Sequence, residues 1–239
     1  MPRIFVIRHA QASFMSADYD RLSELGHTQA QLLAQQLRQT AAQVGPFDAI
    51  VRGPARRHQT TATLLLEGLG AEGLRSGDIV HDPRLDEHDL SALIRAAASD
   101  PAPDPALEAL LRDFGGATDA RAKSKALHRL TESLVAAWIT GEREADDLEP
   151  WPHFSARVRA ALRELCERRG VSLLVVTSVG PLAVMLEACL GLAPLRAFQT
   201  AWQARNSSVT EFIAGPRGIT LNAFNLVAHL PEVSMHTHR

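Results

Sequence analysis

Three apolar runs of the sequence each lead into residues that suit the binding of an anion. Arg8-His9 follows the run at 4–7, Arg57 comes shortly after the run at 47–51, and Ser178 follows the run at 173–177. Ligands bind beyond the carboxyl ends of the strands in open α/β sheets, so these segments are expected to converge. An arginine guanidinium can bond two phosphate oxygens at once, and the free N–H groups of a helix start favour an anion. The sequence therefore predicts a phosphate pocket built from Arg8, His9 and Arg57.

The elements that must position these residues indicate an α/β fold. Short, continuous apolar runs at 4–7 and 173–177 are typical of parallel strands that are buried on both faces. Further strands are predicted at 47–51 and 79–81, with a hairpin formed by 209–213 and 219–224. Helices are predicted between the strands, one of them capped by Ser23 and another at about 55–69. The predicted fold class is α/β: a three-layer sandwich with a mostly parallel central sheet flanked by helices, plus a helical insertion.

Residues from about 90 to 150 have a different composition. Alanine, proline and charged residues dominate there, and clear strand patterns are absent. Two helices are predicted in this stretch, around 107–114 and 127–138. We interpret it as a helical insertion at about 90–150 within a single domain that spans residues 1–239, and we expect it to shape substrate specificity.

The bulk composition narrows the function. A chain of 239 residues with 46% hydrophobic residues can form a sizeable core, and a formal net charge of −2 argues against a nucleic-acid binder. No apolar window is long enough for a membrane span, and the apolar run near the N-terminus is too short for a signal peptide, so we expect a cytoplasmic protein. Cys166 and Cys189 lie in apolar stretches, where buried thiols are expected and a disulfide is not.

An ordered set of motifs resembles the histidine phosphatase superfamily, which has the phosphoglycerate-mutase-like fold. Arg8-His9-Ala10 is similar to the RHG signature of that family. Further resemblances follow in the family's order along nearly the whole chain: Leu22-Ser23-Glu24-Leu25-Gly26 with Gln29-Ala30, Arg56-Arg57-His58-Gln59-Thr60-Thr61-Ala62, Leu85-Asp86-Glu87, Asn206-Ser207-Ser208-Val209-Thr210, and Phe224-Asn225 with Ala228-His229-Leu230.

The resemblance implies a role for each matched side chain. His9 would attack phosphorus through a ring nitrogen and form a phosphohistidine. Arg8 and Arg57 would hold the phosphoryl oxygens and stabilise the charge of the transition state. Glu87 would protonate the leaving oxygen and then activate water. The resemblance implies no metal and no cofactor, because the two arginines supply the positive charge.

The sequence departs from the family at the turn after residues 173–177. A second histidine is expected there, and Ser178 stands in its place, followed by Val179 where the family has glycine. A hydrogen bond to a charged group contributes roughly 1.5–3 kcal/mol, so its loss would slow catalysis about 10- to 100-fold or more. His88 and His229 are candidates to compensate. Ala10 in place of the signature glycine costs about 1 kcal/mol only if that position needs a positive φ.

Simpler interpretations stand beside these. Ser178 suits an N-cap that bonds the following helix as well as it suits a phosphate contact. The acidic loop Asp86-Glu87-His88-Asp89 has some features of a metal site, although its spacing fits no standard zinc pattern.

The sequence predicts a phosphomonoester hydrolase that acts on a small phosphorylated substrate, with activity reduced by the change at Ser178. The alternative is a non-catalytic protein that binds a phosphate ligand or inorganic phosphate in a regulatory role. Mutases also occur in the family, but no residue here favours them. No nucleic-acid or membrane partner is expected, and a homodimer is left open.

Overall fold

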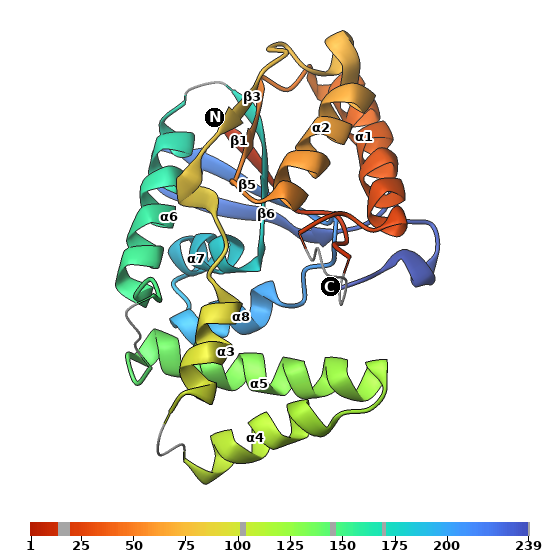
Figure 1. The fold of residues 1–239 in the computed structure, drawn as a ribbon. Helices are drawn as coiled ribbons and strands as arrows, with labels where there is room; N and C mark the ends of the chain where they lie inside the picture. Colours follow the sequence, from red (N-terminus) through yellow and green to blue (C-terminus); the bar gives the residue numbers. More distant parts are fainter. Residues whose placement is uncertain (14–19, 101–103, 144–146, 169–170, 239) are drawn as a thin grey trace. The chain divides into compact units, whose positions relative to one another are not determined.

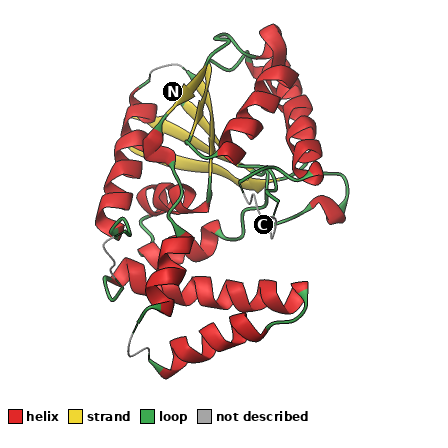
Figure 2. Cartoon of the chain, viewed as in Figure 1, coloured by secondary structure: helices red, strands yellow, loops and turns green. Residues whose placement is uncertain are grey.

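The computed structural model of the protein describes residues 1–13, 20–100, 104–143, 147–168 and 171–238. These residues form two compact units. Figure 2 shows the helices, strands and loops of the chain. The first unit comprises Met1–Glu87 and Ala156–Arg239 and holds the β-sheet, whereas the second comprises His88–Ser155 and is helical. The sequence-based prediction that the second unit is an insertion within a single domain stays a prediction.

A six-stranded mixed sheet forms the centre of the first unit (Figure 1). Its strands are β1 (Arg3–Arg8), β2 (Ala49–Arg52), β3 (Ile79–His81), β4 (Ser172–Thr177), β5 (Val209–Gly215) and β6 (Gly218–Leu226), in the order β3-β2-β4-β1-β5-β6. The first four of this order pair in parallel, and β5 and β6 add an antiparallel hairpin at one edge. The predicted fold class, the parallel strands and the hairpin are confirmed, although β2 begins at Ala49 rather than at residue 47.

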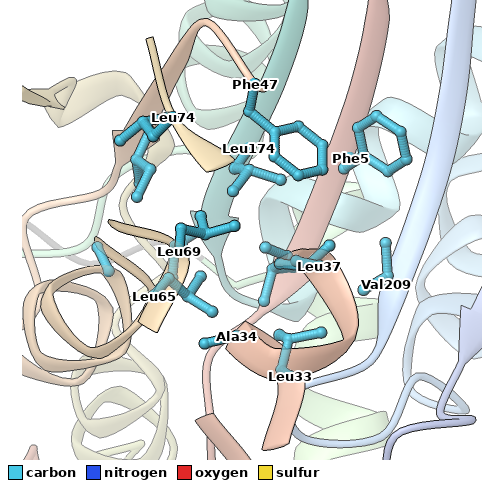
Figure 3. Packing of buried hydrophobic residues seen from close by; sticks show 14 of the residues in the cluster. Phe5, Leu33, Ala34, Leu37, Phe47, Leu65, Leu69, Leu74, Leu174 and Val209 are labelled. Atoms are coloured by element: carbon cyan, nitrogen blue, oxygen red, sulfur yellow. The ribbon is translucent and has the colours of Figure 1, made fainter. Parts of the chain in front are cut away.

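Helices α1 (Glu24–Val44) and α2 (Arg56–Gly73) cover one face of the sheet. Their buried leucines and alanines pack against alternate residues of the strands, because successive side chains of a strand point to opposite faces. Figure 3 shows Leu33, Leu37, Leu65 and Leu69 gathered beneath this face. As predicted, Ser23 caps α1, and its hydroxyl accepts a hydrogen bond from the backbone N–H of Gly26.

The other face of the sheet carries the later helices of the chain. These are α6 (Trp151–Glu167), α7 (Val179–Leu190) and α8 (Pro194–Ala201), and α7 packs on β1, β6 and α8. Figure 1 shows α6 and α7 on the side of the sheet away from α1 and α2, which gives the three layers of the predicted sandwich. Short 3-10 turns at Pro83–Leu85 and Val233–Met235 complete this unit.

The helical unit contains α3 (Leu90–Ala98), α4 (Pro105–Gly116) and α5 (Ala120–Thr140). Within it α5 packs against both α3 and α4, and Trp138 lies at the centre of an aromatic cluster with His88, Trp151 and Phe154. Two helices, α3 and α8, were not predicted from the sequence. Among the described helices, none combines the length and the apolar character that crossing a membrane requires.

Candidate active site

The register of the sheet brings the three predicted segments to one edge. Arg8 at the end of β1 lies beside Thr177 at the end of β4, and the N–H of His9 donates to the Thr177 carbonyl at 2.9 Å. On the other side of β4, the N–H of Gly53 donates to the Val176 carbonyl at 3.1 Å. The segments that follow β1, β2 and β4 therefore begin side by side, as expected for carboxyl ends of parallel strands.

The His9 ring is held in one orientation by a backbone carbonyl. Its Nδ1 lies 2.8 Å from the carbonyl oxygen of Ala10, so Nδ1 carries the proton that this bond needs and Nε2 keeps its lone pair. Burial holds the pKa of His9 well below its usual value, and the positive charges of Arg57 and Arg8 and the neighbouring His58 lower it further. The ring is therefore neutral at physiological pH. Ala10 has no positive φ, so its replacement of glycine introduces no backbone strain.

Arg8 is buried beside His9 and reaches the C-terminal tail. Its Nη1 donates to the carbonyl of Ala204 at 2.5 Å, and its Nη2 donates to the carbonyl of His238. The tail is held in turn by Gln29, whose side-chain amide donates to the Met235 carbonyl at 2.8 Å. No sequence motif pointed to this contact between the tail and the first strand.

Arg57 lies in the first turn of α2 and forms an ion pair with Asp20. The distance from Arg57 Nη1 to Asp20 Oδ1 is 2.6 Å, and the same carboxylate accepts from the backbone N–H of Arg56 at 2.7 Å. Asp20 thus places a negative charge at the start of α2, where the macrodipole favours it. Sequence analysis did not single out Asp20. Arg56 is exposed, whereas the Arg57 side chain is only 13% exposed.

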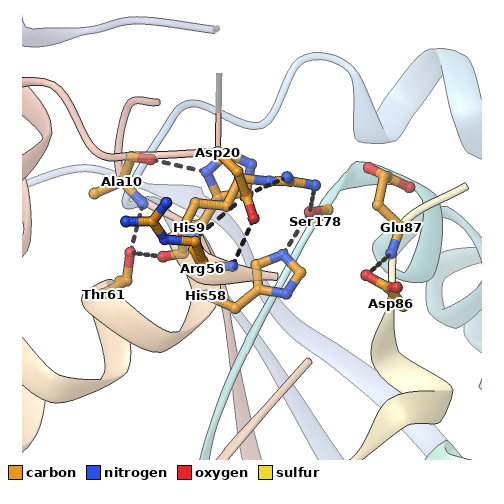
Figure 4. Close-up of polar contacts among 10 residues, drawn as sticks. His9, Ala10, Asp20, Arg56, His58, Thr61, Asp86, Glu87 and Ser178 are labelled. Carbon is orange, nitrogen blue, oxygen red and sulfur yellow. Dashed lines mark hydrogen bonds and ion pairs between the residues drawn. The ribbon is translucent and has the colours of Figure 1, made fainter. Parts of the chain in front are cut away.

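Ser178 stands at the N-cap position of α7, but its side chain makes no capping hydrogen bond. The interpretation of Ser178 as a side-chain N-cap is therefore wrong. Its Oγ instead lies 2.6 Å from Nε2 of His58 and 3.5 Å from Nη2 of Arg57 (Figure 4). Ser178 and Arg57, two of the predicted residues, are thus brought into contact.

His58 is, with Asp20, a residue of this site that sequence analysis missed. It is fully buried in α2, and its ring centroid lies 5.6 Å from that of His9. Burial and the charge of Arg57 lower the pKa of His58 to about 3, against the opposing charges of Glu87 and Asp20. Its helical spacing to the buried residues Ala62 and Leu65 was the available sign that its ring points inward.

Glu87 lies in the loop that follows the 3-10 turn at Pro83–Leu85, and its carboxylate reaches the first turn of α7. Both of its carboxylate oxygens accept from the N–H of Gly180, at 3.0 and 3.2 Å. The loop that carries it is fixed by Arg157, which donates to the carbonyls of Arg84 and Asp86 at 2.7 and 3.0 Å. Burial raises the pKa of Asp86, the neighbouring carboxyl. The charge of Glu87 acts on His58, which links Glu87 to the cluster around Ser178.

The two histidines that were candidates to compensate for Ser178 have other partners. His88 belongs to the helical unit and stacks on Trp138, with ring centroids 5.4 Å apart. His229 places Nε2 at 2.9 Å from Oγ of Ser207. Across the described part of the chain, no group of three or more histidine, cysteine, aspartate or glutamate side chains is arranged to hold a metal ion.

Comparison with known proteins agrees with this geometry. The sequence model of the histidine phosphatase superfamily (branch 1) matches residues 4–94 and 92–227. A comparison with curated proteins found no match.

Solved structures with the same fold include three enzymes that act on phosphorylated compounds. A mutant phosphoserine phosphatase from Entamoeba histolytica, in complex with phosphoserine, is 18% identical with a TM-score of 0.61, covering 96% of this chain and all (100%) of that one. Mycobacterial glucosyl-3-phosphoglycerate phosphatase is 24% identical with a TM-score of 0.59, covering 95% of this chain and 99% of that one. Phosphoglycerate mutase from Bacillus anthracis is 17% identical with a TM-score of 0.61, covering 95% of this chain and 94% of that one. At these identities the likeness shows the fold.

Proposed function

The chain belongs to the histidine phosphatase superfamily, and we propose that it hydrolyses a small phosphomonoester through a phosphohistidine formed on His9. One observation carries the proposal: the 2.8 Å contact between His9 Nδ1 and the Ala10 carbonyl. It leaves the lone pair of a buried, neutral imidazole on Nε2, at the edge where Arg57 and Ser178 meet. A neutral imidazole held in one tautomer is a suitable nucleophile for phosphorus.

In the first step, Nε2 of His9 attacks phosphorus while the bond from phosphorus to the leaving oxygen breaks. Negative charge spreads over the three remaining phosphoryl oxygens, and the guanidinium groups of Arg8 and Arg57 stabilise it. Arg57 is partly buried and already oriented by Asp20, so little reorganisation accompanies the reaction.

Glu87 would supply the proton for the leaving oxygen in this step and remove a proton from water in the next one. The attacking water then displaces His9 from phosphorus, which releases inorganic phosphate and restores the neutral ring. Support for this role comes from the position of the Glu87 carboxylate at the start of α7 and its electrostatic influence on His58.

The substrate class is a small phosphorylated compound. Among proteins of the same fold, one structure holds phosphoserine and another protein acts on glucosyl-3-phosphoglycerate. Hydrolysis is favoured over phosphoryl transfer back to a product, because no residue of the described site is assigned to holding a phosphorylated product. We expect neither nucleic acid nor membrane as a partner. The cytoplasmic location, the specificity role of residues 90–150 and the homodimer stay predictions.

A second function remains a proposal because of Ser178. A protein that lacks the second histidine still has two arginines and can bind a phosphate ligand without turning it over. The serine at position 178 supports this alternative, a non-catalytic binding or regulatory protein. A measurement of substrate turnover distinguishes the two functions.

The test compares the parent with His9→Ala on nitrophenyl phosphate. Turnover that disappears in His9→Ala supports hydrolysis, and rapid quench with a labelled substrate should then find an acid-labile, base-stable phosphoryl group on His9. Activity that survives His9→Ala would exclude the mechanism. A parent that binds phosphate but releases no product would favour the non-catalytic alternative. Phosphate should raise Tm in either case, through mass action.

A further inference from the structure

The contact between His58 and Ser178 joins two elements that are far apart in the sequence. His58 comes from the first turn of α2 and Ser178 directly follows β4, and the two residues are 0% and 1% exposed. The distance of 2.6 Å between Nε2 and Oγ is that of a strong hydrogen bond. Packing alone does not explain this buried polar pair, because apolar side chains would fill the same space without the cost of desolvating polar atoms.

The surroundings of the His58 ring decide which atom donates. Nδ1 of His58 is buried and has no hydrogen-bond partner among the described residues. A buried N–H without an acceptor is costly and rare, whereas an unused lone pair is tolerated more often. The ring is neutral and has only one N–H, so the proton lies on Nε2 and is donated to Ser178 Oγ.

This donation determines what the Ser178 hydroxyl can do. A hydroxyl accepts two hydrogen bonds and donates one. Oγ already accepts from His58 Nε2 and, at 3.5 Å, from Arg57 Nη2. No acceptor for its own O–H is found in the described part of the chain, and the amides at the start of α7 are donors as well. The O–H is therefore available to an acceptor outside the protein, beside the guanidinium of Arg57.

We propose that His58 is a positioning residue that directs the Ser178 hydroxyl at a phosphoryl oxygen, so that the two side chains together replace the missing second histidine. The inference rests on the proposed function, since it assigns a contact to the same phosphate. The neutral Ser178 hydroxyl donates to the phosphoryl oxygen, and the neutral His58 ring donates to that hydroxyl and orients it. A histidine introduced at position 178 would overlap the His58 ring, so the test removes each side chain of the pair instead.

A double-mutant cycle on the binding of inorganic phosphate tests the proposal. The variants are Ser178→Ala, His58→Phe and the combination, with circular dichroism to verify folding. If His58 acts through Ser178, each single change weakens phosphate binding roughly 10-fold, and the combination weakens it roughly 10-fold as well rather than 100-fold. With nitrophenyl phosphate, the same variants should lower kcat more than they raise KM. His58→Gln, which keeps an N–H donor near the position of Nε2, should recover most of the loss.

The outcomes separate this inference from the proposed function. Losses that add in the combined variant, or a folded His58→Phe that binds phosphate as the parent does, would overturn the role of His58 while leaving His9 untouched. Activity that is insensitive to His9→Ala would instead overturn the mechanism itself. Should His58→Phe not fold, ¹⁵N NMR of the parent protein decides: a proton on Nε2 of His58 supports the proposal, and a proton on Nδ1 contradicts it.

Discussion

The buried ring of His9 owes its neutrality to its surroundings and its tautomer to a single carbonyl. Burial lowers the pKa of His9, and the neighbouring cation Arg57 adds to the effect. A cationic imidazole has no lone pair, so the same environment that makes protonation unfavourable keeps the nucleophile available. The Ala10 carbonyl then decides which nitrogen reacts. At this scale the site is prepared for attack on phosphorus before any substrate is bound.

The role of Glu87 predicts a dependence on the leaving group. Glu87→Gln keeps the side-chain length but cannot donate or accept the proton. We expect the variant to slow hydrolysis of alkyl phosphates about 100-fold or more, because their leaving oxygens need protonation. Nitrophenyl phosphate, whose leaving group is stable as an anion, should be affected much less in the first step. Single-turnover kinetics with both substrates make the measurement, and equal losses would show that Glu87 is not the acid.

Asp20 places a negative charge against Arg57, one of the proposed phosphate ligands. Asp20→Asn removes that charge but keeps an acceptor for the backbone N–H groups of α2. Phosphate then meets less repulsion, so we expect its affinity to increase roughly 3- to 10-fold, most visibly at low salt. Calorimetric titration with inorganic phosphate measures the change.

Asp78→Asn is the control, because it makes an equal change of charge at an exposed residue that is hydrogen-bonded to Ser76. It should leave the affinity for phosphate unchanged. Weaker binding in Asp20→Asn would mean that Asp20 mainly orients Arg57.

At the scale of elements, the strands and the longer helices were predictable, and the two shortest α-helices, α3 and α8, were not. The apolar runs of β1 and β4, the hairpin of β5 and β6, and the long helices α1, α2 and α5 follow from periodicity and turn residues. Helices α3 and α8 have nine and eight residues, too few turns for periodicity to distinguish them from loop. His58 was missed for a related reason, because a match to a sequence motif does not show which of the matched side chains points inward.

Gly53 has no side chain, so α2 and the loop before Glu87 approach its backbone closely. We therefore expect a methyl group at this position to destabilise the fold. A Cβ at Gly53 would lie 2.5 Å from Nδ1 of His58 and 2.6 Å from the Leu85 carbonyl oxygen. Gly53→Ala should therefore destabilise the fold by about 1–3 kcal/mol through overpacking, and it should lower activity as His58 is displaced from Ser178. Urea unfolding measures the first effect. Gly77→Ala is the matched control, because nothing lies within 4 Å of a Cβ there. Equal midpoints for the two variants would contradict the prediction.

At the scale of the whole molecule, the site is assembled from segments that only the sheet order brings together. Arg8 is followed along the chain by Arg57 and then by Ser178, but β4 lies between β1 and β2, so the three strand ends are neighbours. The sequence predicted this convergence from the general behaviour of parallel sheets. It could not predict that the C-terminal tail returns to Arg8, because the carbonyls of Ala204 and His238 that accept from Arg8 belong to every residue type and leave no pattern.

Acid stability is the property of the whole molecule that these buried histidines determine. Burial lowers the pKa of His9 well below 6.5, that of His58 to about 3 and that of His229 to about 4. In the unfolded chain all three titrate near pH 6.5, so between about pH 6.5 and 4 the unfolded state binds more protons than the folded one and stability falls as pH falls. Asp86 acts in the opposite direction, since burial raises its pKa, but it is one group against three. Each histidine should lower the free energy of unfolding by about 1.4 kcal/mol for each pH unit in this window.

Thermal unfolding from pH 7.5 to 4.5 should show Tm decreasing steeply below pH 6.5. His229→Asn should reduce this slope by about a third, because one of the three histidines that take up a proton on unfolding is removed. A Tm that stays constant over this range would show that the three rings accept protons in the folded state, and the neutral nucleophile at His9 would lose its physical basis.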